Sequence, residues 1–70
     1  MENLTRSITV NGEPHNLAAA TLAEALVALD YEGAIVATAL NGAFVPKRKR
    51  AETSLKAGDR IEIVAPRQGG

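Results

Sequence analysis

The residues of this chain that could do chemistry lie at its C-terminal end, where Gly69 and Gly70 close the sequence. A globular domain gains no core from such an ending, because glycine has the largest backbone entropy cost and no side chain to bury. Residues 66–70 are therefore predicted to form a flexible arm, which reaches about 17 Å when fully extended. The group that this arm presents is the carboxylate of Gly70. The alternative is a frayed end without a function.

The composition excludes several other kinds of site. The chain has no cysteine, which rules out disulfides, thiolate metal sites and cysteine nucleophiles. With the single histidine His15, a histidine metal cluster is not expected. The formal net charge is zero, so no global field steers a nucleic acid or an anionic membrane. The sequence shows no signal peptide and no stretch of membrane-spanning length, and a cytoplasmic location is expected.

Two further features could carry a function but have simpler explanations. His15 lies in a predicted edge strand and is expected to be a solvated side chain, since a functional histidine needs partners within reach. Residues 47–50 form the run Lys-Arg-Lys-Arg. Nucleic-acid binding is one interpretation, but the run is short and has no neighbouring aromatic side chain. A solvated loop, or a rim that meets an acidic partner, is preferred.

The elements that must position the arm follow from periodicity and turn residues. Alternating polar and apolar side chains predict strands at both ends of the chain, and a nearly continuous apolar run over 34–40 predicts a strand covered on much of both faces. Asn-Gly pairs at 11–12 and 41–42 predict tight hairpins. Leu55 is expected to enter the core from a connecting segment that contains a short helical turn. The predicted strands cover residues 7–10, 13–17, 34–40, 43–45 and 60–65.

One helix is predicted between the second and third strands. Thr21 and Glu24 fit a capping box, in which each side chain satisfies a backbone donor near the other. The helix should end between Asp30 and Gly33, with Gly33 in the left-handed conformation. A chain of this length cannot leave its only helix unburied, so the apolar stripe is assigned to the core. The stripe consists of Leu22, Ala25, Leu26 and Leu29.

The order strand, strand, helix, strand, strand, strand predicts an α+β domain. Two hairpins flank the helix, which must therefore cross one face of a single sheet. A parallel central pair with antiparallel hairpins outside it gives the mixed five-stranded sheet of a β-grasp (ubiquitin-like) fold. Residues 1–65 are assigned to this single domain, with 1–5 frayed at its edge and 66–70 as the arm. The free protein is expected to be a monomer.

The order and spacing of several short motifs resemble the ThiS family of sulfur carriers in thiamine biosynthesis. The resemblance extends from about Ser7 to Gly70. The motifs are Val10-Asn11-Gly12-Glu13, Thr21-Leu22-Ala23-Glu24-Ala25-Leu26, Ala39-Leu40-Asn41-Gly42 followed by Val45-Pro46, Gly58-Asp59-Arg60-Ile61-Glu62-Ile63-Val64, and Gly69-Gly70.

The resemblance implies a chemistry for Gly70. A ThiF-type adenylating enzyme would use ATP and Mg²⁺ to convert its carboxylate to an acyl-adenylate. A sulfur donor, such as a cysteine desulfurase, would supply the sulfur of a thiocarboxylate, and thiazole synthase (ThiG-type) would receive it. Arg67, Gln68 and Gly69 would thread the partner active sites. The chain itself would be a co-substrate without catalytic residues, metal or bound cofactor.

The partners must also recognise the body of the domain, because ordering a flexible arm costs entropy. The solvent face of the sheet near the arm is the expected contact surface, formed by Phe44, Val45 and Val64. Lys47 and Arg48 would form a charged rim beside it. Phe44 could equally belong to the core.

Three other functions are compatible with the residues. The small subunit of molybdopterin synthase shares the fold and the diglycine end. A ubiquitin-like modifier would also be adenylated but would then be joined to lysine amines. Nucleic-acid binding through residues 47–50 is the third. The compact length, and Val-Pro followed by a short segment and Gly-Asp, favour the thiamine pathway.

Overall fold

The computed structural model describes residues 5–65. Residues 1–4 and the predicted arm at 66–70 lie outside the described residues, so the predictions of a frayed start and a flexible arm stay predictions. Within 5–65 the strands are β1 (Arg6–Val10), β2 (Glu13–Leu17), β3 (Ala37–Leu40), β4 (Ala43–Val45) and β5 (Arg60–Val64). The helices are α1 (Leu22–Ala28) and the 3-10 helix η1 (Lys47–Glu52).

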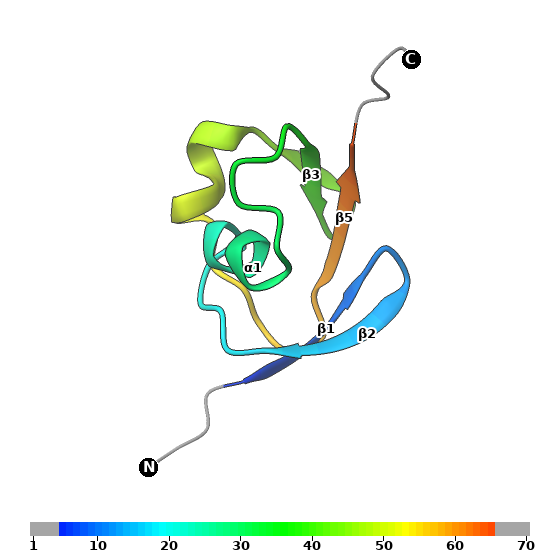
Figure 1. Cartoon of the computed structure of the whole chain (residues 1–70). Coiled ribbons are helices and arrows are strands. Elements are labelled where there is room, and N and C mark those ends of the chain that lie inside the picture. The colour runs from blue at the N-terminus through cyan, green and yellow to red at the C-terminus, as the bar shows by residue number, and fades with distance from the viewer. Residues whose placement is uncertain (1–4, 66–70) are drawn as a thin grey trace.

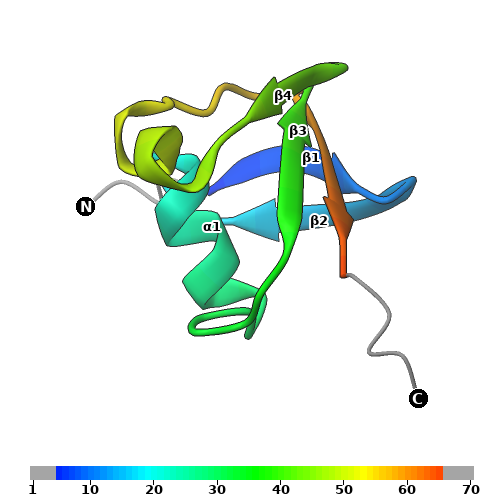
Figure 2. The same cartoon turned by 90° about the horizontal axis from the view of Figure 1, so that it is seen from above.

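The five strands form one mixed sheet in the order β2-β1-β5-β3-β4, and α1 crosses one face of it (Figures 1 and 2). β1 and β5 form the parallel central pair, while β1/β2 and β3/β4 are antiparallel hairpins outside it. Both Asn-Gly turns have positive φ at each residue, at Asn11 and Gly12 and again at Asn41 and Gly42, which a two-residue hairpin requires. The predicted α+β β-grasp architecture is confirmed.

The caps of α1 show how its sequence fixes its length. The Thr21 hydroxyl accepts a hydrogen bond from the backbone N–H of Glu24 at 3.2 Å, and the Glu24 carboxylate accepts one from the N–H of Ala20 at 2.8 Å. At the other end the residue directly after the C-cap, Asp30, is left-handed with φ 72°, and Gly33 is left-handed as predicted, with φ 82°. The N–H of Tyr31 then bonds to the carbonyl of Leu26 at 2.7 Å, which closes the last turn.

The core lies between α1 and the sheet. Leu22, Ala25 and Leu26 are buried as predicted, and Leu55 fills the core from the segment after η1. Leu29 is only half-buried against this cluster. Among residues 5–65 no helix is long and apolar enough to cross a membrane. The strand residues of the core are Ile8, Val10, Val45, Ile61 and Ile63.

The predicted strand over 34–40 was too long. Only Ala37–Leu40 pair in the sheet, and Ile35 is 78% exposed. The physical reason is register, because Ala37 lies opposite Val64, which is the last residue of β5. Residues 34–36 precede this ladder and form a connection from α1 to β3, so an apolar sequence alone did not make them a strand.

Candidate functional site

The predicted reactive group and its neighbours in the arm cannot be placed. Arg67, Gln68, Gly69 and Gly70 all lie outside the described residues. The structure does describe β5, the strand that leads to them, and the surfaces on both sides of it. β5 is the middle strand of the sheet, so residues 66–70 follow a strand that is paired with a neighbour on each side. The candidate site is therefore the C-terminal end of β5 together with these surfaces (Figure 1).

The end of β5 is held by a side chain from the first hairpin. The Asn11 side-chain oxygen accepts a hydrogen bond from the N–H of Ile63 at 2.8 Å, and its amide donates to the carbonyl of Ile63 at 3.1 Å. Asn11 thus acts as one more residue of the neighbouring strand, beyond the last paired residue Val10. The sequence predicted Asn11 only as a turn residue, because nothing local in an Asn-Gly pair signals a partner far along the chain.

The start of β5 is held in the same way by the second hairpin. The Asn41 side-chain oxygen accepts from the N–H of Arg60 at 2.8 Å, and its amide donates to the Asp59 carboxylate at 3.0 Å. Partial burial alone would raise the pKa of Asp59. The hydrogen bonds from Asn41 and from the Lys56 N–H, together with the charge of Lys56, outweigh burial and lower that pKa. Both ends of β5 are therefore fixed by hairpin asparagines.

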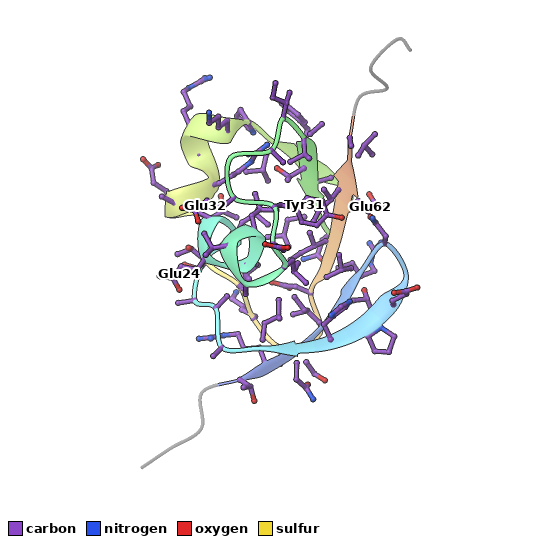
Figure 3. The ribbon with its side chains drawn as sticks, viewed as in Figure 1. Glu24, Tyr31, Glu32 and Glu62 are labelled. Atoms are coloured by element: carbon purple, nitrogen blue, oxygen red, sulfur yellow. The ribbon has the colours of Figure 1, made fainter. Side chains whose placement is uncertain are left out.

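The solvent face of the sheet beside β5 carries an exposed apolar patch. Phe44 and Val64 are 69% and 63% exposed. They lie on neighbouring cross-strand rows, since Ala39 is opposite both Phe44 and Glu62, and Ala37 is opposite Val64. The alanines between them are small, so the two larger side chains stand out from the face. Glu62 projects from β5 away from α1 (Figure 3). We call Phe44, Val64, Ala37 and Ala39 the sheet-face patch.

Val45 was wrongly assigned to this surface. It is only 8% exposed and belongs to the core. Successive strand residues point to opposite faces, so Val45 must face α1 if Phe44 faces solvent. The structure also decides the open question about Phe44, which is on the surface and not in the core.

The basic run does not form a uniform rim. Lys47 and Arg48 are exposed at the start of η1, as a charged rim requires. Arg50, by contrast, is only 8% exposed, so the expectation that all of residues 47–50 are solvated was wrong. Its Nε donates to the Thr38 hydroxyl at 3.0 Å and its Nη2 to the carbonyl of Val36 at 2.7 Å. The Thr38 hydroxyl donates in turn to the carbonyl of Val45 at 2.8 Å. Arg50 therefore ties η1 to the sheet.

The lone histidine differs from its expected solvated state. His15 is half-buried and lies opposite Ile8 in the β1/β2 ladder, near the edge of the core. No hydrogen bond or ion pair joins its side chain to the described part of the chain. Over residues 5–65 no group of three or more His, Cys, Asp or Glu side chains could hold a metal ion.

A mixed β-grasp sheet whose central strand leads to a diglycine ending defines a protein of the ubiquitin-like class. Comparison with known proteins gives the family. The ThiS family model matches residues 8–70. Among solved structures, the crystal structure of the thiamine biosynthesis protein (ThiS) from Geobacter metallireducens is similar, with 32% sequence identity and a TM-score of 0.76. The match covers 91% of this chain and 99% of that one. No curated protein matches the chain.

The chain belongs to the ThiS family, whose members are the small sulfur carriers of thiamine biosynthesis. This confirms the resemblance drawn from the hairpins, the helix start and the diglycine end. It also confirms the ubiquitin-like β-grasp fold.

Proposed function

We propose that this protein carries sulfur on its C-terminus for the synthesis of the thiazole ring of thiamine. A carboxylate is a poor electrophile, because its charge repels nucleophiles. Attack of the Gly70 carboxylate on the α-phosphorus of ATP, with Mg²⁺ and an adenylating enzyme, releases pyrophosphate and leaves an acyl-adenylate. The persulfide of the sulfur donor then displaces AMP, which joins the chain end to the donor as an acyl disulfide. A thiol reductant attacks the donor's sulfur and breaks the S–S bond, so that the donor leaves as a disulfide and the chain ends in a thiocarboxylate, which thiazole synthase consumes.

The observation that carries this proposal is the position of β5. The strand that leads to Gly69 and Gly70 is the central strand, clamped at both ends by Asn11 and Asn41. A rigid base of this kind fixes where the arm begins. Glycine at the last position leaves the attacked carbonyl uncrowded, since it has no Cβ, and glycine before it lets the backbone pass through a narrow active site.

The sheet-face patch is the surface that we propose for partner recognition. Its exposed Phe44 and Val64 lie beside the end of β5, and an exposed apolar patch of this kind is typical of protein contact sites. Lys47 and Arg48 supply positive charge that would favour an acidic partner surface. The adenylating enzyme and thiazole synthase would bind the same face in turn.

The decisive experiment is mass spectrometry of the intact protein after incubation with the cognate adenylating enzyme, ATP, Mg²⁺ and a sulfur donor. The expected product has one terminal oxygen replaced by one sulfur. A variant that lacks Gly70 is the control, and it should fold normally and remain unloaded. An unmodified terminus in the full chain would refute the carrier function.

Two related measurements separate the alternative functions. A branched lysine adduct in cells would identify a ubiquitin-like modifier. Transfer of sulfur from the loaded chain to thiazole synthase, and not to the large subunit of molybdopterin synthase, would assign the pathway. The family match supports the thiamine assignment.

A further inference from the structure

A groove lies on the helix side of the sheet, and it shares Lys47 with the charged rim of the sheet-face patch. It is bounded by α1, the connection 31–36 and η1, and encloses about 330 Å³. Leu26, Val27 and Ile35 give it apolar walls, while Lys47 and Arg50 bring positive charge to it. A volume of this size is at the lower end of the range for small-molecule sites. Of its lining residues, the proposed sulfur-carrier function uses only Lys47.

Arg50 is an unusual lining residue because its guanidinium is both buried and incompletely used. Nε and Nη2 are bound to Thr38 and Val36, which fixes the plane of the group. Within residues 5–65, Nη1 has no hydrogen-bond partner and no acidic side chain forms an ion pair with the group. Since no fully buried side-chain nitrogen or oxygen in this range lacks a partner, Nη1 must reach the surface. The groove therefore offers a rigid, partly desolvated cation with a free donor edge.

The other residues that line the groove indicate which chemical groups a bound anion could carry. Lys47 adds a second cation that has no hydrogen bond or ion pair within the described part of the chain. Ile35 and Val27 are exposed in spite of being large and apolar, and their burial by a ligand would be favourable. Glu32 lies on the η1 side of α1, in the groove lining (Figure 3). Its negative charge would repel a bound anion.

From this geometry we propose that the groove binds a small aliphatic carboxylate. The carboxylate accepts hydrogen bonds from Arg50 Nη1 and from the Lys47 ammonium, as charge-assisted pairs. The aliphatic chain packs against Leu26, Val27 and Ile35. Both the carboxylate and the aliphatic chain are needed for binding, because the apolar wall is small and only one of the two cations, Arg50, is held in place by hydrogen bonds.

Hexanoate is the probe, added to the ¹⁵N-labelled full chain at neutral pH. Saturable chemical-shift changes are expected at the amides of Val27, Ile35 and Lys47 and at the side-chain Nε–H of Arg50. Acetate has the charge without the chain, and 1-hexanol has the chain without the charge. Each should bind at least about tenfold more weakly than hexanoate, since each loses one of the two contributions.

Three variants are expected to weaken, strengthen or leave unchanged the binding of hexanoate. Lys47→Gln should weaken hexanoate binding about fivefold, and Glu32→Gln should strengthen it. Lys49→Gln is the matched control, because Lys49 is an exposed cation on the same helix η1 but does not line the groove. Binding to Lys49→Gln should be unchanged within about twofold.

The proposal is overturned if hexanoate gives no saturable shifts, or if the shifts lie outside the groove. Equal weakening by Lys47→Gln and Lys49→Gln would also overturn it, since that result indicates only diffuse attraction to η1. Ile35→Ser keeps the test independent of folding defects at Arg50, because an exposed side chain can be changed without loss of the core. It should weaken hexanoate more than acetate.

Discussion

Phe44 and Val45 are adjacent residues on opposite faces of β4, and truncating each to alanine separates recognition from stability. Val45 is 8% exposed, so Val45→Ala removes two buried methyl groups and leaves a small cavity. At about 0.8 kcal/mol for each group, plus the cavity, the free energy of unfolding should fall by about 2 kcal/mol. For a domain of this size that lowers Tm by on the order of 10 °C.

Phe44→Ala should behave in the opposite way. Because Phe44 is 69% exposed, only about a third of its side chain is removed from water by folding. The expected loss is below about 1 kcal/mol, or a few degrees in Tm. If the sheet-face patch binds the adenylating enzyme, truncation of its largest side chain should reduce the rate of carrier adenylation about tenfold.

Two assays test this pair of variants. Thermal unfolding followed by far-UV circular dichroism measures stability, and ATP–pyrophosphate exchange at subsaturating carrier measures adenylation at a temperature where both variants are folded. Val45→Ala should retain nearly wild-type exchange there. Phe44→Leu, which keeps an apolar side chain, should recover part of the rate. A Phe44→Ala protein that is as destabilised as Val45→Ala, or that exchanges at the wild-type rate, would refute the assignment of the patch.

Three predictions concern the scaffold. Asn11→Gly keeps a residue that tolerates the positive φ but removes both hydrogen bonds to Ile63. The free energy of unfolding should fall by about 1–2 kcal/mol, and hydrogen exchange at the Ile63 N–H should accelerate. Unchanged exchange would show that these two hydrogen bonds do not stabilise the end of β5. Asp30→Gly removes the steric cost of a left-handed non-glycine residue at φ 72°, so the free energy of unfolding should rise by about 0.5–1 kcal/mol and the denaturation midpoint with it. A lower midpoint would contradict this account of the helix end. The lowered pKa of Asp59 means that its carboxylate stabilises the fold above the ordinary value of 3.8 and that this contribution is lost as pH falls through the lower folded-state pKa. Urea titrations should therefore show Asp59→Asn to be less stable than wild type at neutral pH, with a gap that narrows well below pH 3.8; a gap independent of pH would exclude the charged form as the cause.

The local features of the fold could be predicted because their signals are local. Two Asn-Gly pairs, the Thr21–Glu24 cap and alternating strands determine the element order, and that order leaves few ways to bury one helix. The limits of β3 could not be predicted in the same way. Ile35 looks like a strand residue in sequence, and only the register between Ala37 and Val64 shows that the ladder begins after it.

The surfaces were harder to predict than the elements. Phe44-Val45 is a short apolar pair that does not itself show which member faces the helix, and grouping both on one face ignored the alternation of a strand. Arg50 was missed because four consecutive basic residues look uniform in sequence. Its burial depends on Thr38 and on the carbonyl of Val36, which lie 12 and 14 residues away along the chain. The end of the chain, where the proposed chemistry lies, was predicted only from composition and resemblance.

The central place of β5 has a consequence for synthesis of the protein. β5 is the last strand to leave the ribosome, yet it must enter between β1 and β3, and its clamp to Asn11 spans 52 residues. Until it emerges, the two hairpins have no common partner and the sheet cannot close. Closure of the sheet therefore waits for β5 and depends on long-range pairing. A chain that lacks β5 cannot close the sheet, so the folded domain always contains the strand that leads to the proposed reactive end.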